Sequence, residues 1–106
     1  MSQANELTNQ IINFIFKQGG YAWRASSTGI FDAKLGGYRT AAKKGVSDVL
    51  ACFSGKCIAI EVKIGKDRLS SEQDGFLTNI KATGGLAFVA KDLKSFEIFW
   101  NEFVGK

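Results

Sequence analysis

Three charged side chains, Asp48, Glu61 and Lys63, interrupt two apolar segments that otherwise have the pattern of buried β-strands. A sheet tolerates carboxylates in such places only where something compensates their charge. Two carboxylates beside an ammonium group offer the hard oxygen ligands that divalent cations prefer. The sequence therefore predicts a divalent-metal site. The alternative is a buried ion pair between Lys63 and one acid, which leaves the second carboxylate unexplained.

The turn between the two segments decides whether the acids meet. If Ser54 and Gly55 are the two turn residues, paired positions sum to 109, which places Asp48 directly opposite Glu61. Opposed residues hold their Cβ atoms about 4.5–5.5 Å apart, and like charges at that distance destabilise the pair. Lys63 follows Glu61 by two residues and so emerges on the same face of the sheet. We expect all three groups to cluster at one end of the sheet.

The apolar periodicity predicts the elements that hold this cluster. It indicates an α/β protein, a mixed β-sheet flanked by helices with the element order α-β-β-β-α-β-α. Helices are predicted over residues 5–18 and 70–82, with a last helix that Asp92 caps. Strands are predicted over residues 21–25, 47–53, 57–64 and 86–90, and residues 26–45 are predicted to form a long loop.

Composition limits the class of protein. The chain has 106 residues, 45% of them hydrophobic, and its apolar runs are all shorter than the roughly 20 residues that span a bilayer. These features predict one domain over residues 1–106, without a membrane partner and located in the cytoplasm. The sequence contains no histidine, which excludes Ser-His-Asp catalysis and His-ligated metal sites. The two cysteines, Cys52 and Cys57, are too few for a secreted disulfide framework.

Basic side chains concentrate in the middle of the chain. Residues 21–66 contain eight Lys and Arg against three Asp and Glu, a net charge of +5, whereas residues 67–106 carry −1. Such a segment is either a solvated basic face or a surface that binds nucleic acid. The predicted DNA contacts are Arg24, Arg39, Lys43, Lys44 and Lys66.

Two groups of aromatic residues have more than one interpretation. Strand alternation puts Tyr21 and Trp23 on one face and Arg24 on the other. This pattern favours the two rings as core residues, with stacking on DNA as the alternative. The apolar stripe of the last helix, which includes Trp100 and Phe103, is predicted to lie in the core, and part of it could serve as a dimer interface.

An ordered motif surrounds the charged cluster. Ser47-Asp48 is followed by a short hairpin and by Glu61-Val62-Lys63, which resembles the PD-(D/E)XK nuclease signature. The match is closer to the VRR-NUC branch of that superfamily, and it covers about residues 6–90. Ser47 stands where the family motif has proline. The further matches are Gly45, Leu69-Ser70 and Gln73.

The resemblance implies a restriction-endonuclease-like fold and hydrolysis of DNA phosphodiester bonds that depends on Mg²⁺ or Mn²⁺. It implies that Asp48, Glu61 and the backbone carbonyl of Val62 bind the metal ion. Lys63 would orient the attacking water or stabilise charge that develops on the phosphate.

Two further residues match the family and also have a local explanation. Glu6 matches an acidic position near the metal, and the alternative is a carboxylate favoured by the helix dipole. Gln73 matches a helix glutamine close to the catalytic lysine, and it is therefore counted with the catalytic group. It also has the position of a capping-box residue with Ser70, and the two roles are compatible.

The small stand-alone members of this branch, typical of phages, resemble structure-selective enzymes that act as dimers on four-way junctions. The resemblance therefore implies a homodimer that cuts branched DNA such as Holliday junctions. The alternatives are a less specific nickase or flap-type nuclease, or a catalytically silent DNA-binding module of the same fold.

Overall fold

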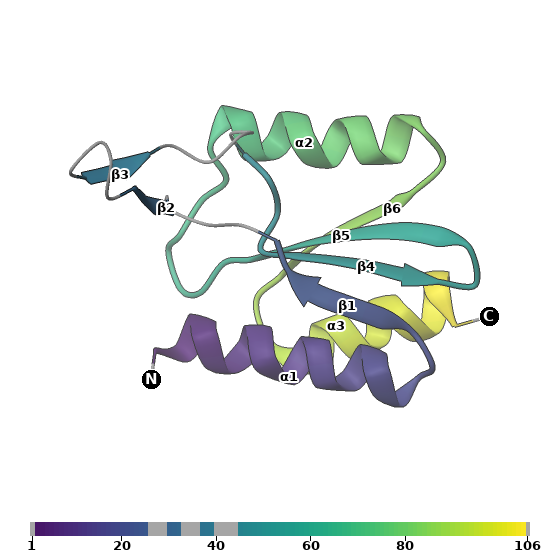
Figure 1. The fold of residues 1–106 in the computed structure, drawn as a ribbon. Coiled ribbons are helices and arrows are strands. Elements are labelled where there is room, and N and C mark those ends of the chain that lie inside the picture. The colour runs from purple at the N-terminus through teal and green to yellow at the C-terminus, as the bar shows by residue number, and fades with distance from the viewer. Residues whose placement is uncertain (1, 26–29, 33–36, 40–44, 106) are drawn as a thin grey trace.

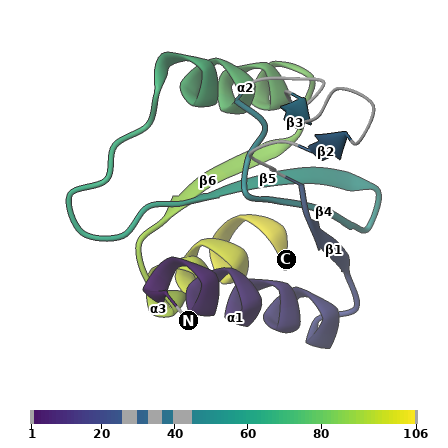
Figure 2. The same ribbon diagram turned by 60° about the vertical axis from the view of Figure 1, so that its left-hand side comes forward.

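The computed structural model describes residues 2–25, 30–32, 37–39 and 45–105, with the backbone alone described for 30–32 and 37–39. A central sheet lies between α2 on one face and α1 and α3 on the other (Figures 1 and 2). Within the described residues, no helix combines the length and the apolar content that a membrane span requires. The elements are α1 (Gln3–Lys17), β1 (Tyr21–Arg24), β2 (Ile30–Asp32), β3 (Gly37–Arg39), β4 (Val49–Phe53), β5 (Lys56–Val62), α2 (Ser71–Ala82), β6 (Leu86–Ala90), α3 (Leu93–Phe99) and the π-helix η1 (Trp100–Val104).

The central sheet has the strand order β1-β4-β5-β6. β4 pairs antiparallel with both β1 and β5, whereas β6 runs parallel to β5. This mixed sheet with helices on both faces confirms the predicted fold class. β2 and β3 form a separate two-stranded sheet, inserted between β1 and β4 in the segment predicted as a loop. Each of these strands has three residues, which is too short for a period of two to be recognised.

The β4–β5 hairpin has the predicted register. Ser54 and Gly55 have φ angles of 50° and 78°, the positive values that a two-residue type I′ turn requires. Cys52 therefore pairs with Cys57, and the ladder continues until Val49 faces Ile60. Each pair sums to 109, so the same register carried one step further places position 48 opposite position 61.

The hydrophobic core lies between the sheet and the layer of α1, α3 and η1. Ile11 and Ile15 of α1 and Ile58 and Ile60 of β5 are fully buried there. Asp92 caps α3 as predicted, because its Oδ1 accepts a hydrogen bond of 2.7 Å from the Ser95 amide.

The C-terminal helix differs from its predicted stripe at one position. Phe96 and Trp100 are buried, but Phe103 is 57% exposed and Val104 is buried instead. The chain passes from α-helix to π-helix at Trp100. The wider turn shifts the following side chains around the axis, so the core placement predicted for Phe103 is wrong.

The two faces of β1 are the reverse of the prediction. Ala22 is the buried residue, whereas Tyr21 is 63% exposed and Trp23 is 40% exposed. The core placement predicted for these two rings is therefore wrong. β1 is an edge strand, and its register with β4 turns Ala22 toward the helices of the core. Arg24 lies on that side as well, and its guanidinium donates hydrogen bonds to the Asn5 backbone carbonyl and the Asn5 and Asn9 side chains in α1.

Candidate metal centre

Asp48 lies directly before β4, at the end of the sheet where β1 finishes. The Ala25 amide donates a hydrogen bond of 3.0 Å to the Asp48 carbonyl, which ties this residue to the edge strand. On the other side, the Val62 amide donates a hydrogen bond of 2.7 Å to Asp48 Oδ2. In a continuing hairpin that amide would face the backbone of Ser47. The carboxylate takes the place of a backbone acceptor and is thereby held against β5.

Glu61 is the most buried charged residue among those that the structure describes, with 1% of its surface exposed. It projects from β5 toward α2, where its Oε1 accepts a hydrogen bond of 3.4 Å from Gln73 Nε2. Its other oxygen, Oε2, is buried and has no hydrogen-bond partner. A buried oxygen without a donor is unfavourable unless a proton or a cation occupies the place beside it.

The electrostatic environment of Glu61 favours the protonated acid. Burial is the largest of the causes that raise the pKa of Glu61 to about 8. Asp48 raises this pKa further in two ways, through a hydrogen bond and through its charge. The Asp48 carboxyl accepts a hydrogen bond from the protonated form, and its negative charge opposes ionisation. Lys63 lowers the pKa, but its effect is the smallest of those named. Without a metal ion, this environment therefore favours the protonated form of Glu61.

Gln73 connects this pair to α2. The backbone amide of Gln73 donates a hydrogen bond of 3.1 Å to Ser70 Oγ. The side-chain Oε1 of Gln73 accepts one of 2.9 Å from the Ser70 backbone amide, which completes the predicted capping box. The side-chain nitrogen remains for Glu61. The helix cap thus orients the side-chain amide of Gln73, whose nitrogen contacts Glu61. Gln73 therefore serves both as a capping residue and as a neighbour of the candidate site.

The chain before Asp48 approaches the first turn of α2 closely. Gly45 has a φ angle of 80°, and a Cβ atom built there would lie 2.4 Å from the Glu72 carbonyl oxygen. Only glycine fits both conditions. Ser47, which stands at the proline position of the nuclease motif, is fully buried and donates a hydrogen bond of 2.8 Å to the Val49 carbonyl. The sequence marked both residues as motif positions but did not indicate these contacts.

The remaining predicted metal-site residues lie at different depths. Lys63 is half-buried, and its backbone amide donates a hydrogen bond of 3.0 Å to the Ala90 carbonyl of β6. Val62 lies between Glu61 and Lys63 at the end of β5. Glu6 is exposed in the first turn of α1. In the described part of the chain, no three His, Cys, Asp or Glu side chains group closely enough to hold a metal ion, so the structure does not bring Glu6 to the acid pair.

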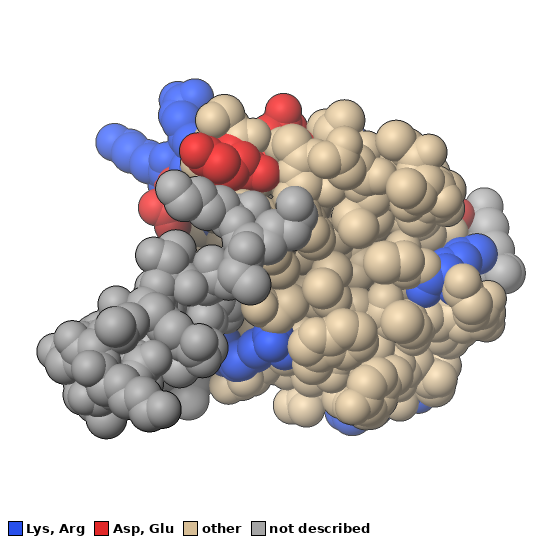
Figure 3. Space-filling model, turned by 45° about the horizontal axis from the view of Figure 1, so that its top comes forward, with Lys and Arg blue, Asp and Glu red and all other residues tan. Residues whose placement is uncertain are grey.

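The predicted DNA contacts are only partly visible. Arg24 is held against α1 rather than pointing freely into solvent. Lys66 is exposed in the segment between β5 and α2. Lys43, Lys44 and the side chain of Arg39 lie outside the described residues. Charged side chains gather at one end of the face seen in Figure 3, and most of the other visible surface is uncharged.

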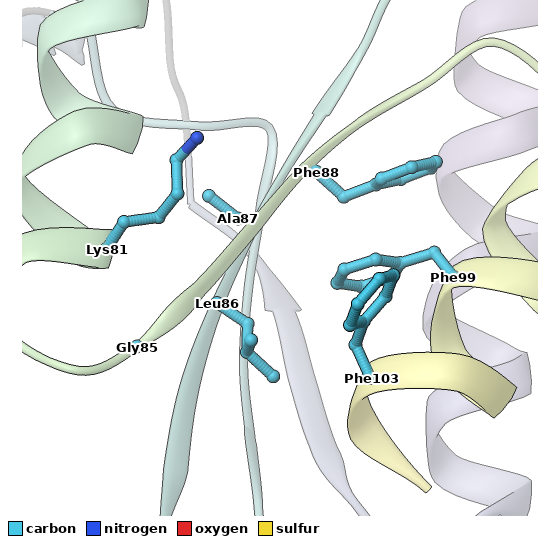
Figure 4. A pocket seen from close by; sticks show the side chains of 7 residues that line it. All are labelled: Lys81, Gly85, Leu86, Ala87, Phe88, Phe99 and Phe103. Atoms are coloured by element: carbon cyan, nitrogen blue, oxygen red, sulfur yellow. The ribbon is translucent and has the colours of Figure 1, made fainter.

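A cavity of about 450 Å³, shown in Figure 4, is lined by residues that include neither Asp48 nor Glu61. It lies between Lys81 near the end of α2, Leu86 and Phe88 of β6, and the rings of Phe99 and Phe103. No carboxylate lines it, so it has no part in the candidate metal centre.

Comparison with known proteins bears on the fold. No protein-family model matches the sequence, and no curated protein is significantly similar to it. Among solved structures, the chain is similar to Hjc, a Holliday junction resolvase from the archaeal hyperthermophile Archaeoglobus fulgidus. The two are 23% identical, with a TM-score of 0.57 over 83% of this chain and 67% of the resolvase chain. The protein has the restriction-endonuclease-like fold, as its sequence predicted.

Proposed function

We propose that this protein is a divalent-metal-dependent endonuclease that hydrolyses phosphodiester bonds in DNA. The observation that carries the proposal is the pair of opposed carboxyls, in which Glu61 Oε2 is buried without a donor. An ion pair with Lys63 would have lowered the pKa of Glu61, but burial and Asp48 raise this pKa by more than Lys63 lowers it. The fold likeness to a junction resolvase supports the same conclusion.

Each side chain has a role that its position suits. Asp48, Glu61 and the Val62 carbonyl would hold Mg²⁺ or Mn²⁺, because hard cations prefer oxygen ligands and the acid pair needs a positive charge. When bound, the ion supplies a Lewis acid and a water molecule of lowered pKa. Lys63 stabilises the negative charge that grows on the phosphate, and Gln73 orients Glu61. Glu6 is not part of this set.

The proposed substrate is branched DNA, with four-way junctions first. This finer assignment is supported by the activity named for the structural neighbour and by the resemblance of the motif to small VRR-NUC proteins. A two-fold homodimer would present two such sites and could nick two strands symmetrically. A nickase or flap-type nuclease needs the same residues in a monomer. A catalytically silent DNA-binding module has no need of two acids that destabilise each other.

The test is cleavage of labelled four-way, flap and linear duplex DNA in Mg²⁺, Mn²⁺ or EDTA, with Asp48→Asn as the matched variant. Asparagine keeps an oxygen that accepts from the Val62 amide, and its NH₂ group replaces the carboxylate oxygen whose charge opposes ionisation of Glu61. We expect Asp48→Asn to lose cleavage while its metal-free stability equals or exceeds that of the parent protein.

Two results would contradict the proposal. Cleavage by Asp48→Asn at the parent rate would remove Asp48 from the site. A parent protein that binds DNA but leaves every substrate intact in both metals would be the silent module.

A further inference from the structure

Three aromatic side chains form an exposed row at the edge of the sheet. Phe16, near the end of α1, meets Tyr21 edge to face with ring centroids 5.7 Å apart. Tyr21 in turn lies 5.6 Å from Trp23, with the two rings tilted by 43°. Tyr21 is 63% exposed and Trp23 is 40% exposed. Rings of this size seldom remain exposed together on a surface that binds nothing.

Tyr21 and Trp23 share a face of the sheet with Glu61. Trp23 pairs with Leu50, and Leu50 pairs with Ala59, so these three side chains project to one side. Glu61 follows Ala59 by two residues and projects to the same side. From strand geometry, the Cα atom of Trp23 lies about 8 Å from that of Asp48, two residues along and one strand across.

Among the helices that the structure describes, the layer above the sheet does not extend over this row. α2 packs on β5 and β6, whereas β1 lies at the opposite edge. Figures 1 and 2 show α2 above the part of the sheet that contains β5 and β6, with β1 at the other edge of the sheet. The α2 side turned forward in Figure 3 has a broad uncharged area beside its group of charged side chains.

We propose that Tyr21 and Trp23 are a stacking platform for unpaired bases of the DNA strand that the Asp48–Glu61 pair cleaves. This inference rests on the proposed function and specifies which DNA the site selects. Aromatic side chains stack on any base, provided that the base has left its own stack. In a linear duplex the bases are paired and stacked, so the platform engages only single strands, flaps and branch points. Phe16 braces Tyr21 from the side.

Nucleic acid fits this surface better than a second copy of the chain does. The rings lie beside a candidate phosphodiester site, within the segment 21–66 that carries a net charge of +5. Aromatic rings within a basic segment of the chain are a combination typical of proteins that bind single-stranded nucleic acid. The competing occupant is a second copy of the chain, which would bury the row in a dimer interface. The experiment separates DNA binding from dimer formation.

The protein contains a suitable internal probe. Of its two tryptophans, Trp23 is exposed and Trp100 is buried with 1% exposure. Oligothymidine added in EDTA should quench the fluorescence of the parent protein. It should leave Trp23→Phe, which retains only Trp100, unchanged.

Binding by fluorescence anisotropy supplies the second measurement. Trp23→Leu, which keeps apolar bulk without a ring, and Tyr21→Ala should each weaken flap and oligothymidine binding by about tenfold or more. Binding to linear duplex should not change. Trp23→Phe should retain most of the affinity. Ile98→Ala is the matched control, because Ile98 is apolar and 50% exposed, between Trp23 and Tyr21 in exposure, but lies on α3, in the opposite layer.

The results that would overturn the platform differ from those that would overturn the nuclease. If the parent cleaves branched DNA in metal but Trp23→Leu binds flaps as tightly as the parent, the platform is wrong and the nuclease stands. If light scattering shows that Trp23→Leu dissociates a dimer while oligothymidine binding is kept, the row is a subunit interface. If the parent neither binds nor cuts any DNA, both proposals fail.

Discussion

At the scale of single residues, the carboxyl of Glu61 has the largest consequence for the folded protein. Burial and Asp48 raise its pKa from the ordinary value of 4.5 to about 8. The folded protein therefore holds this proton more tightly than the unfolded chain does. The stability that results is fully present below about pH 4.5 and is lost as the pH rises through about 8.

We expect the metal-free protein to become less stable as the pH rises across this window. Urea unfolding in EDTA at several pH values measures the effect, whose size is on the order of a few kcal/mol for a shift this large. Glu61→Gln should flatten the profile, because glutamine cannot lose a proton. A parent profile that rises between these pH values would contradict the environment assigned to Glu61. Saturating Mn²⁺ should reduce the decline, since the cation favours the ionised pair.

Lys63 has two interpretations that its substitution separates. As a group that stabilises charge in the transition state, Lys63→Ala should lose roughly two to three orders of magnitude in cleavage rate and still bind DNA and metal. As a structural partner of a buried acid, its loss should cost about 3–5 kcal/mol of stability. Because Lys63 has the smallest of the effects on the pKa of Glu61, we expect the first result. Single-turnover cleavage and thermal melts in EDTA, made on one preparation, provide the comparison.

At the scale of elements, the N-terminus of α2 combines a cap with a site contact. Gln73→Glu keeps a side-chain acceptor for the Ser70 amide but removes the donor to Glu61 and adds a third carboxyl. We expect this variant to lose cleavage more than stability. Ser70→Ala removes the cap, at a cost of about 1 kcal/mol, and leaves the Gln73 amide in place. It should therefore lose stability more than cleavage. Equal losses of both properties in the two variants would mean that Gln73 acts only through the helix.

At the scale of the whole molecule, the basic middle of the chain is expected to carry the phosphate contacts. Lys43 and Lys44 lie outside the described residues, so this prediction rests on the charge of the segment 21–66. The double variant Lys43→Ala/Lys44→Ala should weaken binding to every DNA substrate alike. It should also lower the slope of log K against log salt by up to about two. Anisotropy titrations at several salt concentrations measure this slope. An unchanged slope would place the DNA on another surface.

Features that depend on neighbours along the chain were determined by the sequence. Ser54 and Gly55 set the hairpin register, because a two-residue turn with positive φ angles admits one pairing. The caps at Ser70 and Asp92 were also predictable from local sequence, because a helix cap joins residues three positions apart in the chain. The acid pair followed from the register. The opposition of positions 48 and 61 was thus predictable before the fold was known.

Features that depend on distant packing were decided by the tertiary structure. β1 is an edge strand, and its pairing with β4 buries Ala22 and exposes Tyr21 and Trp23, although hydrophobicity alone favours the opposite. The placement of α2 over β5 brings Gln73 to Glu61 and leaves Oε2 of that acid without a donor. Local sequence encodes backbone geometry over a few residues, whereas burial is set by whichever layer lies above a strand. Only the assembled sheet and helices therefore determine which strand residues are buried.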